Sequence, residues 1–340
     1  MKKLLAVLLC MVMVFSMAAC GGGGEEGGAE GEVYEITYAG TVADTHTLAV
    51  STREAAEKMA ELSDGRIKLT LFPNNQLGDF VSCFNQMQVN GSVQMGEVSS
   101  ASLTAATDLF TPYSLPFLFT SKEQCFNFFD NSPIIDELEE KFLEETGVRI
   151  LGYYYNDARA LSNSIRPVSK PEDIKGIKVR VMQSDVYIKT FEALGALPVS
   201  MSFSELFTAL QQGNVDGQDN GSALTVATKF HEVQDYYTDL GHVYDIAPIM
   251  VSEEYWQSLP ADIQQIIADC MAEAVIEERG DYDVTGAADL EAIGELCEVT
   301  LLSEEQRLEF QKACEPVYDW YREAYPQYDL DAILEEVAKY

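Results

Sequence analysis

Residues 176–220 read GIKVRVMQSDVYIKTFEALGALPVSMSFSELFTALQQGNVDGQDN, and this stretch decides the fold. Apolar and basic side chains alternate over residues 177–181, which is typical of a β-strand. Apolar residues then recur at helical spacing over 186–194, and a capping box opens a second helix over 202–210. A strand followed by two helices in this order predicts an α/β protein.

The same alternation of strands and helices continues on both sides of this stretch. Toward the N-terminus we expect a strand over 34–39, a helix over 48–62 and a strand over 66–72. Further along, Gly280 and Gly286 interrupt a long helical pattern, and either of them could bend it. The other expected elements are a helix over 80–87, a strand over 93–98, helices beginning at Ser121 and Pro133, a strand over 148–154, the long helix from Pro260 to Leu296, a strand over 299–301, and a terminal helical region opened by Ser303 and Glu305.

The N-terminus has the pattern of a secretion signal. Lys2 and Lys3 precede an apolar run over 4–17, which is short for a membrane span. The small residues before Cys20 resemble a bacterial lipobox, so we expect residues 1–19 to be removed and Cys20 to carry fatty acyl chains such as palmitate. Residues 20–32 then form a Gly- and Glu-rich linker. The alternative is a plain signal peptide in which the cysteine is incidental.

The charge balance excludes one class of partner. The chain has 22 Lys and Arg against 56 Asp and Glu, a formal net charge of -34. A surface this acidic repels phosphate backbones, so we expect no nucleic-acid binding.

Cysteines outside the signal are widely spaced. They form no C-x-x-C pair, so the sequence predicts neither a zinc site nor a redox pair, and at least one thiol should be free. A bridge between Cys270 and Cys297 is left open. The five residues concerned are Cys83, Cys125, Cys270, Cys297 and Cys314.

Catalytic signatures are absent from the sequence. It contains no G-x-S-x-G elbow, no H-E-x-x-H motif and no phosphate-binding loop. The three histidines are scattered, and paired glutamates fall on helical patterns as solvated faces do. We therefore expect a protein that is not an enzyme and that holds no metal or cofactor.

Arg180 is the residue that most needs an explanation. It stands between Val179 and Val181 in an apolar strand, where a cation requires an anionic partner. A planar guanidinium matches the two oxygens of a carboxylate. The partner could instead be an internal aspartate, either Asp173 or Asp185.

Four blocks of the opening stretch occur in the order of one known family. They are Gly-Ile-Lys-Val-Arg-Val at 176–181, Gly-Ala-Leu-Pro at 195–198, Phe-Ser-Glu at 203–205 and Val-Asp-Gly-Gln-Asp-Asn at 215–220. Together they resemble the solute-binding proteins of tripartite ATP-independent periplasmic (TRAP) transporters, the dicarboxylate-binding or DctP-like family. Four earlier segments also fit, and the resemblance extends over roughly residues 33–335. Those segments are Ala56-Glu-Lys-Met59, Gly65-Arg-Ile67, Phe72-Pro-Asn-Asn-Gln-Leu-Gly78 and Leu115-Pro-Phe-Leu-Phe119.

The resemblance implies the type II periplasmic binding protein fold. That fold has two α/β domains, a hinge, a ligand cleft between the domains and a long helix that spans both. We assign domain I to residues 33–156 and 246–285, and domain II to 157–245 and 286–340.

The resemblance also implies a function. Such a receptor captures a small organic carboxylate outside the cytoplasm and delivers it to a small and a large membrane subunit. A lipid on Cys20 would hold it on the outer face of the cell membrane. The alternatives are the binding protein of an ATP-driven importer and a surface-anchored hydrolase. Neither the identity of the carboxylate nor the oligomeric state follows from the sequence.

Four candidate ligand-binding residues come from the second domain. In the family, the arginine at the position of Arg180 makes the main salt bridge to the solute carboxylate. Arg159 matches a second arginine, with Arg166 as the competing candidate. Asn220 matches an asparagine that hydrogen-bonds the solute, and its alternative role is that of a turn residue. Phe203 matches an aromatic that packs on the solute, or it is plain core.

The first domain supplies four looser candidates. Asp79 falls where some relatives place an acidic contact, although it also suits a helix N-cap. Some relatives carry a glutamate near residues 97–100, where the register places Ser99 closest and Glu97 two positions away. His46 falls on the first strand-to-helix loop, which borders the cleft, or is a plain surface histidine.

Overall fold

Two β-sheets form the frame of the protein, and the computed structural model describes residues 31–340. The first sheet has the order β2-β1-β3-β10-β4, with parallel pairs of β1 with β2 and β3 and antiparallel pairs of β10 with β3 and β4. Its strands are β1 (Tyr34–Ala39), β2 (Ile67–Phe72), β3 (Met95–Glu97), β4 (Val148–Ala158) and β10 (Tyr244–Ser252). The expected β-α-β opening is confirmed.

The second sheet contains the stretch that decides the fold. Its order is β11-β9-β5-β8-β6-β7, and β6 pairs in parallel with both β7 and β8. Because parallel strands point the same way, the residues that follow these three strands meet at one edge of the sheet. The strands are β5 (Leu161–Asn163), β6 (Lys178–Val181), β7 (Leu197–Ser200), β8 (Gly217–Gln218), β9 (Tyr236–Asp239) and β11 (Glu298–Leu301).

The helices that the sequence predicts begin at or within one residue of their expected starts. Ser121 caps its helix by accepting a hydrogen bond from the Gln124 amide, and Pro133 occupies the first turn of the next helix. One detail was wrong, since the capping partner of Ser303 is Gln306 and not Glu305. The helices other than the long one are α1 (Thr47–Leu62), α2 (Phe80–Gln88), α3 (Ser100–Leu103), α4 (Lys122–Asn131), α5 (Pro133–Thr146), α6 (Pro171–Ile174), α7 (Asp185–Ala193), α8 (Phe203–Gln211), α9 (Ser222–Ala227), α10 (Glu253–Ser258), α12 (Glu304–Ala324) and α13 (Leu330–Val337).

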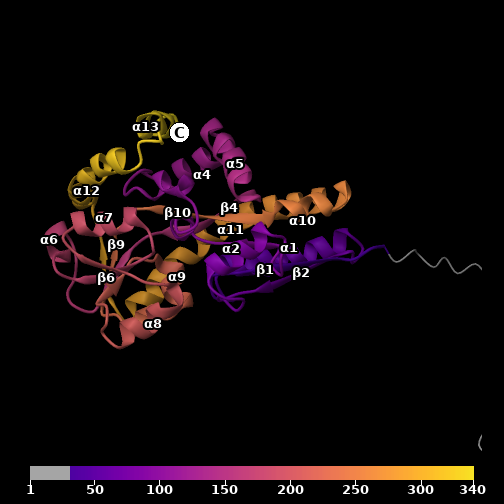
Figure 1. Ribbon diagram of the computed structural model, residues 1–340. Coiled ribbons are helices and arrows are strands. Elements are labelled where there is room, and N and C mark those ends of the chain that lie inside the picture. Colours follow the sequence, from indigo (N-terminus) through magenta and orange to yellow (C-terminus); the bar gives the residue numbers. More distant parts are fainter. Residues whose placement is uncertain (1–30) are drawn as a thin grey trace, which may run out of the picture. The chain divides into compact units, whose positions relative to one another are not determined.

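The long helix α11 (Ala261–Gly294) joins the two halves of the fold. It packs against α1 and β4 on the side of the first sheet and against α9 and β11 on the side of the second. In Figure 1 the orange ribbon extends from the half that holds β1 and β2 toward the half that holds β6. The prediction of an interruption was wrong, because the helix continues through Gly280 and Gly286 for 34 residues. The expected α/β architecture, with a long helix that contacts both halves, is confirmed.

The described cysteines are all buried and free, so the Cys270–Cys297 bridge is not formed. Within residues 31–340 no helix is long and apolar enough to cross a bilayer. The expectations for residues 1–19 and for Cys20 lie outside the described residues.

A buried carboxyl on α11 makes the stability of the fold depend on pH. Burial raises the pKa of Glu278 from its ordinary value of 4.5 to about 8. Its Oε2 accepts from the Tyr155 amide at 3.0 Å, and its Oε1 accepts from the Thr47 hydroxyl at 3.2 Å. Between pH 4.5 and 8 the folded protein therefore keeps a proton that the unfolded chain releases, and the free energy of unfolding falls as pH rises.

We expect Glu278→Gln to flatten this pH dependence. The glutamine amide keeps an acceptor for Tyr155 and a donor toward Thr47, but it cannot ionise. Relative to the natural chain, the variant should gain on the order of 2–4 kcal/mol in the free energy of unfolding between pH 5 and pH 9. Urea denaturation at a series of pH values would measure this, with the exposed neighbour Glu277→Gln as control. Parallel curves for the natural chain and Glu278→Gln would contradict the prediction.

Candidate functional site

A cavity of about 570 Å³ lies between residues of the two halves of the fold. The first half contributes the loops that follow β1, β2 and β3, and the second contributes the segments that follow β6, β7 and β8. Its polar and charged lining residues are Thr41, Asn75, Asp79, Ser99, Ser102, Asn156, Arg159, Arg180, Gln183, Ser202, Ser204 and Asn220.

Arg180 lies in this cavity as a buried cation without an acidic partner. Its side chain is 2% exposed, and Nε and Nη2 donate to the Met201 carbonyl at 3.1 and 2.9 Å. Its Nη1 has no hydrogen-bond partner. Burial lowers the pKa of Arg180 to about 10, which still leaves the guanidinium charged at neutral pH. The guanidinium therefore has a free donor and an unbalanced charge at the cavity wall.

The internal ion pair considered for Arg180 is not formed. Asp173 accepts from the backbone amides of Ser169 and Lys170 instead, and Asp185 lies in the first turn of α7. Among residues 31–340 no carboxylate lies within ion-pair distance of Arg180. Within these residues the Arg180 guanidinium therefore has no ion-pair partner.

Arg159 also lines the cavity, but its charge is compensated. It is 2% exposed, and it forms ion pairs with Asp219 at 3.1 Å and Asp245 at 2.7 Å. Burial acts to lower the pKa of Arg159, but the two carboxylates outweigh this effect and raise it. The competing Arg166 is exposed, lies outside the cavity, and donates to backbone carbonyls of residues 173 and 175.

Asp219 and Asp245 are buried residues that the sequence did not single out. Asp245 accepts from Arg159, from the hydroxyls of Ser99 at 2.6 Å and Ser100 at 3.0 Å, and from Asn156 Nδ2 at 2.9 Å. Asp245 thereby links Ser99 and Ser100 of the first half of the fold to Arg159 of the second half. The signal that could have identified it is an aspartate inside the apolar strand β10.

Burial acts to raise the pKa of Asp219, but Arg159 and His242 outweigh it and hold the pKa well below its usual range. His242 is fully buried beside it, with Nε2 3.6 Å from the Asp219 carboxylate. Asp219 is therefore an ionised partner of Arg159.

Asn220 is placed in the cavity wall by a tight strand pairing. A Cβ atom added to Gly217 would lie 2.3 Å from the Ser162 carbonyl, so only glycine permits this approach of β8 to β5. Asn220 then donates to Gln218 Oε1 at 2.6 Å and accepts from Arg159 at 2.8 Å. Asn220 therefore lines the cavity with both atoms of its amide hydrogen-bonded to neighbouring side chains, and a contact with the solute stays a prediction.

Phe203 opens α8 and lies at the same edge of the sheet. Its ring centroid is 5.9 Å from the Arg180 guanidinium and 6.0 Å from the Phe230 ring. The half-buried ring thus lines the cavity and contacts a small apolar cluster around Leu206 and Phe230. The contact with this cluster is observed, and packing of Phe203 on a solute stays a prediction.

Two of the first-domain candidates reach the cavity. Asp79 is exposed in the wall and also caps α2, accepting from the Ser82 amide at 2.9 Å. Ser99 lines the cavity while it donates to Asp245.

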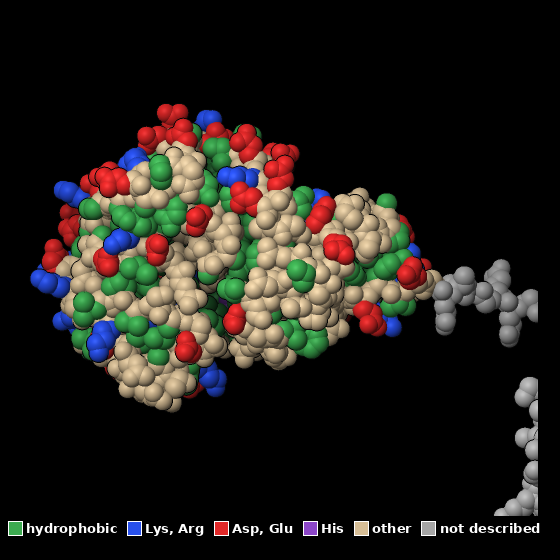
Figure 2. Space-filling view, viewed as in Figure 1, with side chains coloured by type: hydrophobic (Ala, Val, Ile, Leu, Met, Phe, Trp, Pro, Cys, Tyr) green, Lys and Arg blue, Asp and Glu red, His purple; other side chains and the backbone are tan. Residues whose placement is uncertain are grey.

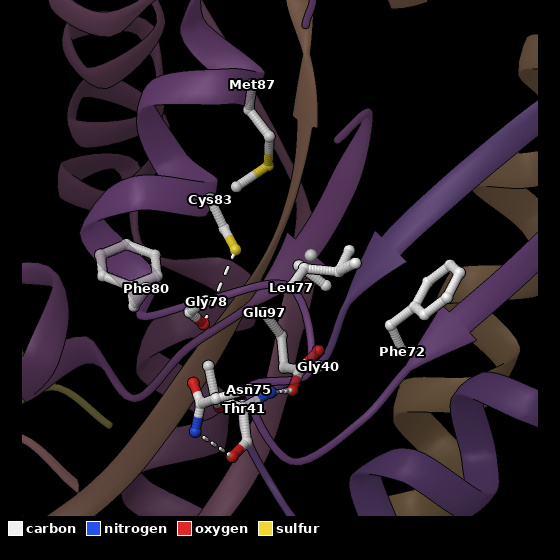
Figure 3. A pocket seen from close by; sticks show the side chains of 12 residues that line it. Gly40, Thr41, Phe72, Asn75, Leu77, Gly78, Phe80, Cys83, Met87 and Glu97 are labelled. Carbon is white, nitrogen blue, oxygen red and sulfur yellow. Dashed lines mark hydrogen bonds between the residues drawn. The ribbon is translucent and has the colours of Figure 1, made fainter. Parts of the chain in front are cut away.

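Glu97 and His46 do not line this cavity. Glu97 lies behind the wall in a small pocket, where its Oε1 accepts from the Thr41 amide at 2.9 Å (Figure 3). Burial raises the pKa of Glu97 to about 7. His46 is buried rather than on the surface, and its Nδ1 caps α1 by accepting from the Leu48 amide at 3.3 Å. Burial lowers the pKa of His46 to about 4, which keeps the ring neutral for that role.

Asn156 is a lining residue that the sequence did not indicate. It is 5% exposed, and its Nδ2 donates to Asp245. Its Oδ1 has no hydrogen-bond partner, so a buried acceptor is left open beside the cavity.

The arrangement suits non-covalent capture of an anion. Within residues 31–340 no group of three or more acidic, histidine or cysteine side chains is placed to hold a metal ion. Acidic side chains outnumber basic ones on the face of the molecule in Figure 2, so the buried guanidinium contrasts with the surface charge.

Comparisons with known proteins agree with this geometry. The family model for bacterial extracellular solute-binding protein, family 7 (DctP), matches residues 38–324. The C4-dicarboxylate-binding periplasmic protein DctP of Shewanella loihica is 31% identical over 88% of this chain and 89% of its own.

Solved structures show the same fold. The sugar acid binding protein of Advenella mimigardefordensis in complex with galactonate has a TM-score of 0.86 and 29% identity, covering 91% of this chain and 99% of its own. A TRAP periplasmic solute-binding protein of Sulfurospirillum deleyianum with bound succinate has a TM-score of 0.83 and 26% identity, covering 90% and 99%. The chain described here belongs to the DctP family of bacterial extracellular solute-binding proteins.

Proposed function

We propose that this protein captures a small organic carboxylate in the cavity and delivers it to the membrane subunits of a TRAP transporter. The observation that carries the proposal is the unpartnered Nη1 of the buried Arg180. A desolvated guanidinium with an open donor binds a carboxylate through strong, charge-assisted hydrogen bonds. The relatives that hold galactonate and succinate support this class of solute.

Solute binding is tested directly by calorimetry and mass spectrometry. Protein purified under native conditions should release an organic acid, and the emptied protein should bind an acid of the same class in an isothermal titration. Release of a neutral or cationic solute would contradict the proposal. Turnover of that solute by the pure protein would favour the hydrolase alternative instead.

Delivery requires the protein to stay near its membrane partners. We propose that a lipid on Cys20 anchors it to the outer face of the cell membrane, and that one small and one large subunit receive the solute. The lipobox-like residues before Cys20 and the polar linker after it support the anchor. The protein should therefore fractionate with membranes, and Cys20→Ala should shift it to the soluble fraction.

Domain closure is the proposed route of capture. We assign one domain to residues 33–156 and 246–285 and the other to 157–245 and 286–340. The two separate sheets support this division, because β4 and β10 belong to the first and β5 to β9 belong to the second. Small-angle scattering with and without solute would test closure as a decrease in the radius of gyration.

A further inference from the structure

The cavity has fewer available positive charges than its two arginines suggest. Arg159 is paired with two aspartates, so the buried group of Arg159, Asp219 and Asp245 has a net negative formal charge. Of the described residues that line the cavity, only Arg180 is a cation without a carboxylate partner. No lysine or histidine is among them.

A second carboxylate on the solute would therefore lack a partner. A buried charge without a counter-ion is strongly unfavourable, whereas a single carboxylate on the solute has the Arg180 guanidinium as its counter-ion. The remaining charged group of the wall is Asp79, whose carboxylate would repel a second anionic group. The charge balance favours a solute with one carboxylate.

The open acceptor on Asn156 indicates what the rest of the solute carries. Its Nδ2 faces Asp245, which is held as an acceptor by Arg159, so the amide oxygen is the atom left free. An amide oxygen needs a donor, and a carboxylate has none to offer at neutral pH. A hydroxyl group supplies that donor, and Asp79 can accept from a second hydroxyl.

Two buried side-chain atoms of opposite character thus remain open in the cavity. They are the donor Nη1 of Arg180 and the acceptor Oδ1 of Asn156, and both side chains are at least nine-tenths buried. Because buried polar groups in native structures are almost always paired, a solute that fills the cavity and offers a carboxylate and a hydroxyl would satisfy both atoms. The polar wall around them includes Thr41, Asn75 and Ser102.

We propose that the solute is a monocarboxylic acid with several hydroxyl groups, the chemical class of sugar acids, rather than a dicarboxylate. The proposal rests on the function proposed above and names its solute class. Family resemblance alone does not decide between the two, since relatives of this fold hold either galactonate or succinate.

The test compares three classes of acid by isothermal titration. The probes are galactonate, gluconate, glucuronate and galacturonate as hydroxylated monocarboxylates, succinate as a dicarboxylate, and hexanoate as a monocarboxylate without hydroxyls. We expect the best hydroxylated acid to bind at least about 100-fold more tightly than succinate and hexanoate, because a site built for hydroxyls rejects analogues that lack them. The acid released from natively purified protein should be of the same class.

The outcomes separate this proposal from the proposed function. Succinate binding as tightly as the best hydroxylated acid, or release of a dicarboxylate from native protein, would overturn the solute class while carboxylate capture stands. If none of the acids binds in the titrations, and the natively purified protein releases no organic acid, the proposed function itself is overturned.

Two variants report on the groups that carry the inference. Asp79→Asn keeps the helix cap and removes the negative charge, so the affinity for succinate should rise about tenfold. The preference for the hydroxylated acid over succinate should decrease accordingly. Its matched control is Asp329→Asn. Asp329 caps α13 outside the cavity, so this change should alter neither the affinity for succinate nor that for the hydroxylated acid.

Asn156→Ala should lower the affinity for the hydroxylated acid at least tenfold and leave the affinity for hexanoate unchanged. The exposed Asn214→Ala is its control. An equal loss for both acids in Asn156→Ala would show a purely structural role and would overturn the assignment of the open acceptor.

Discussion

Replacing Arg180 by alanine is expected to weaken carboxylate binding by on the order of 2–4 kcal/mol, which is roughly 30- to 700-fold in Kd. In the natural protein the guanidinium is buried, has a free Nη1, and lies at the cavity wall. The variant leaves the solute carboxylate desolvated without a counter-ion. Isothermal titration with the cognate acid measures the loss.

The matched control is Arg166→Ala. Arg166 has the same charge but is exposed and donates only to backbone carbonyls outside the cavity, so its removal should leave Kd within a factor of about two. Unchanged affinity in Arg180→Ala would show that another group holds the carboxylate.

Loss of binding on replacement of Arg180 should not reflect unfolding. In the empty protein Arg180 is a buried cation with no acidic partner, and burial lowers its pKa. Replacement of such a group by a side chain of similar volume is often neutral or stabilising. Arg180→Met should therefore denature in urea at the same concentration as the natural chain, or at a higher one, while its binding is lost.

Replacing Arg159 by methionine is expected to act mainly on stability, whereas replacing Arg180 acts mainly on binding. It should lower the free energy of unfolding by on the order of 3–5 kcal/mol, because Asp219 and Asp245 would then be buried without a counter-ion. Urea denaturation at neutral pH measures the change. The control is Lys189→Ala, which breaks a half-exposed ion pair with Glu192 and should cost less than about 1 kcal/mol.

The loss in Arg159→Met should depend on pH in a defined direction. Arg159 holds the pKa of Asp219 well below its usual range, so the ion pair stabilises the folded state above the ordinary aspartate pKa. That contribution disappears as the pH falls through the depressed pKa. The difference between the natural chain and the variant should therefore shrink below about pH 4. A difference that stays constant with pH would mean that the arginine acts by packing alone.

Local patterns predicted most of the larger elements. The helix cap at Ser121, the helix start at Pro133 and the strand that carries Arg180 lie where the sequence placed them, since each depends on neighbours within a few residues. Short strands such as β5 and β8 were missed, because two or three residues carry no periodicity and owe their pairing to distant partners. The long helix was predicted to be interrupted at its glycines, yet its packing on both halves of the fold outweighs their low helix propensity.

Part of the candidate site could be predicted in the same way. Arg180, Phe203 and Asn220 lie in one stretch, and the parallel pairing of β6 with β7 and β8 brings them to one edge. Glu97 was placed by register and His46 by its loop after the first strand, and the structure buries both outside the cavity lining. One residue of register in a strand or loop decides which way a side chain points, and a sequence pattern does not resolve it there.

The sequence by itself determined the fold class, the family and the one arginine that most needs an anion, because these depend on local periodicity and on blocks of adjacent residues. Only the tertiary structure decided which arginine is free. Arg159 meets Asp219 and Asp245 across 60 and 86 residues of chain, and these contacts cancel its charge. Arg180 is left with its open donor, and Asn156 with its open acceptor, because folding buries each group without supplying its partner.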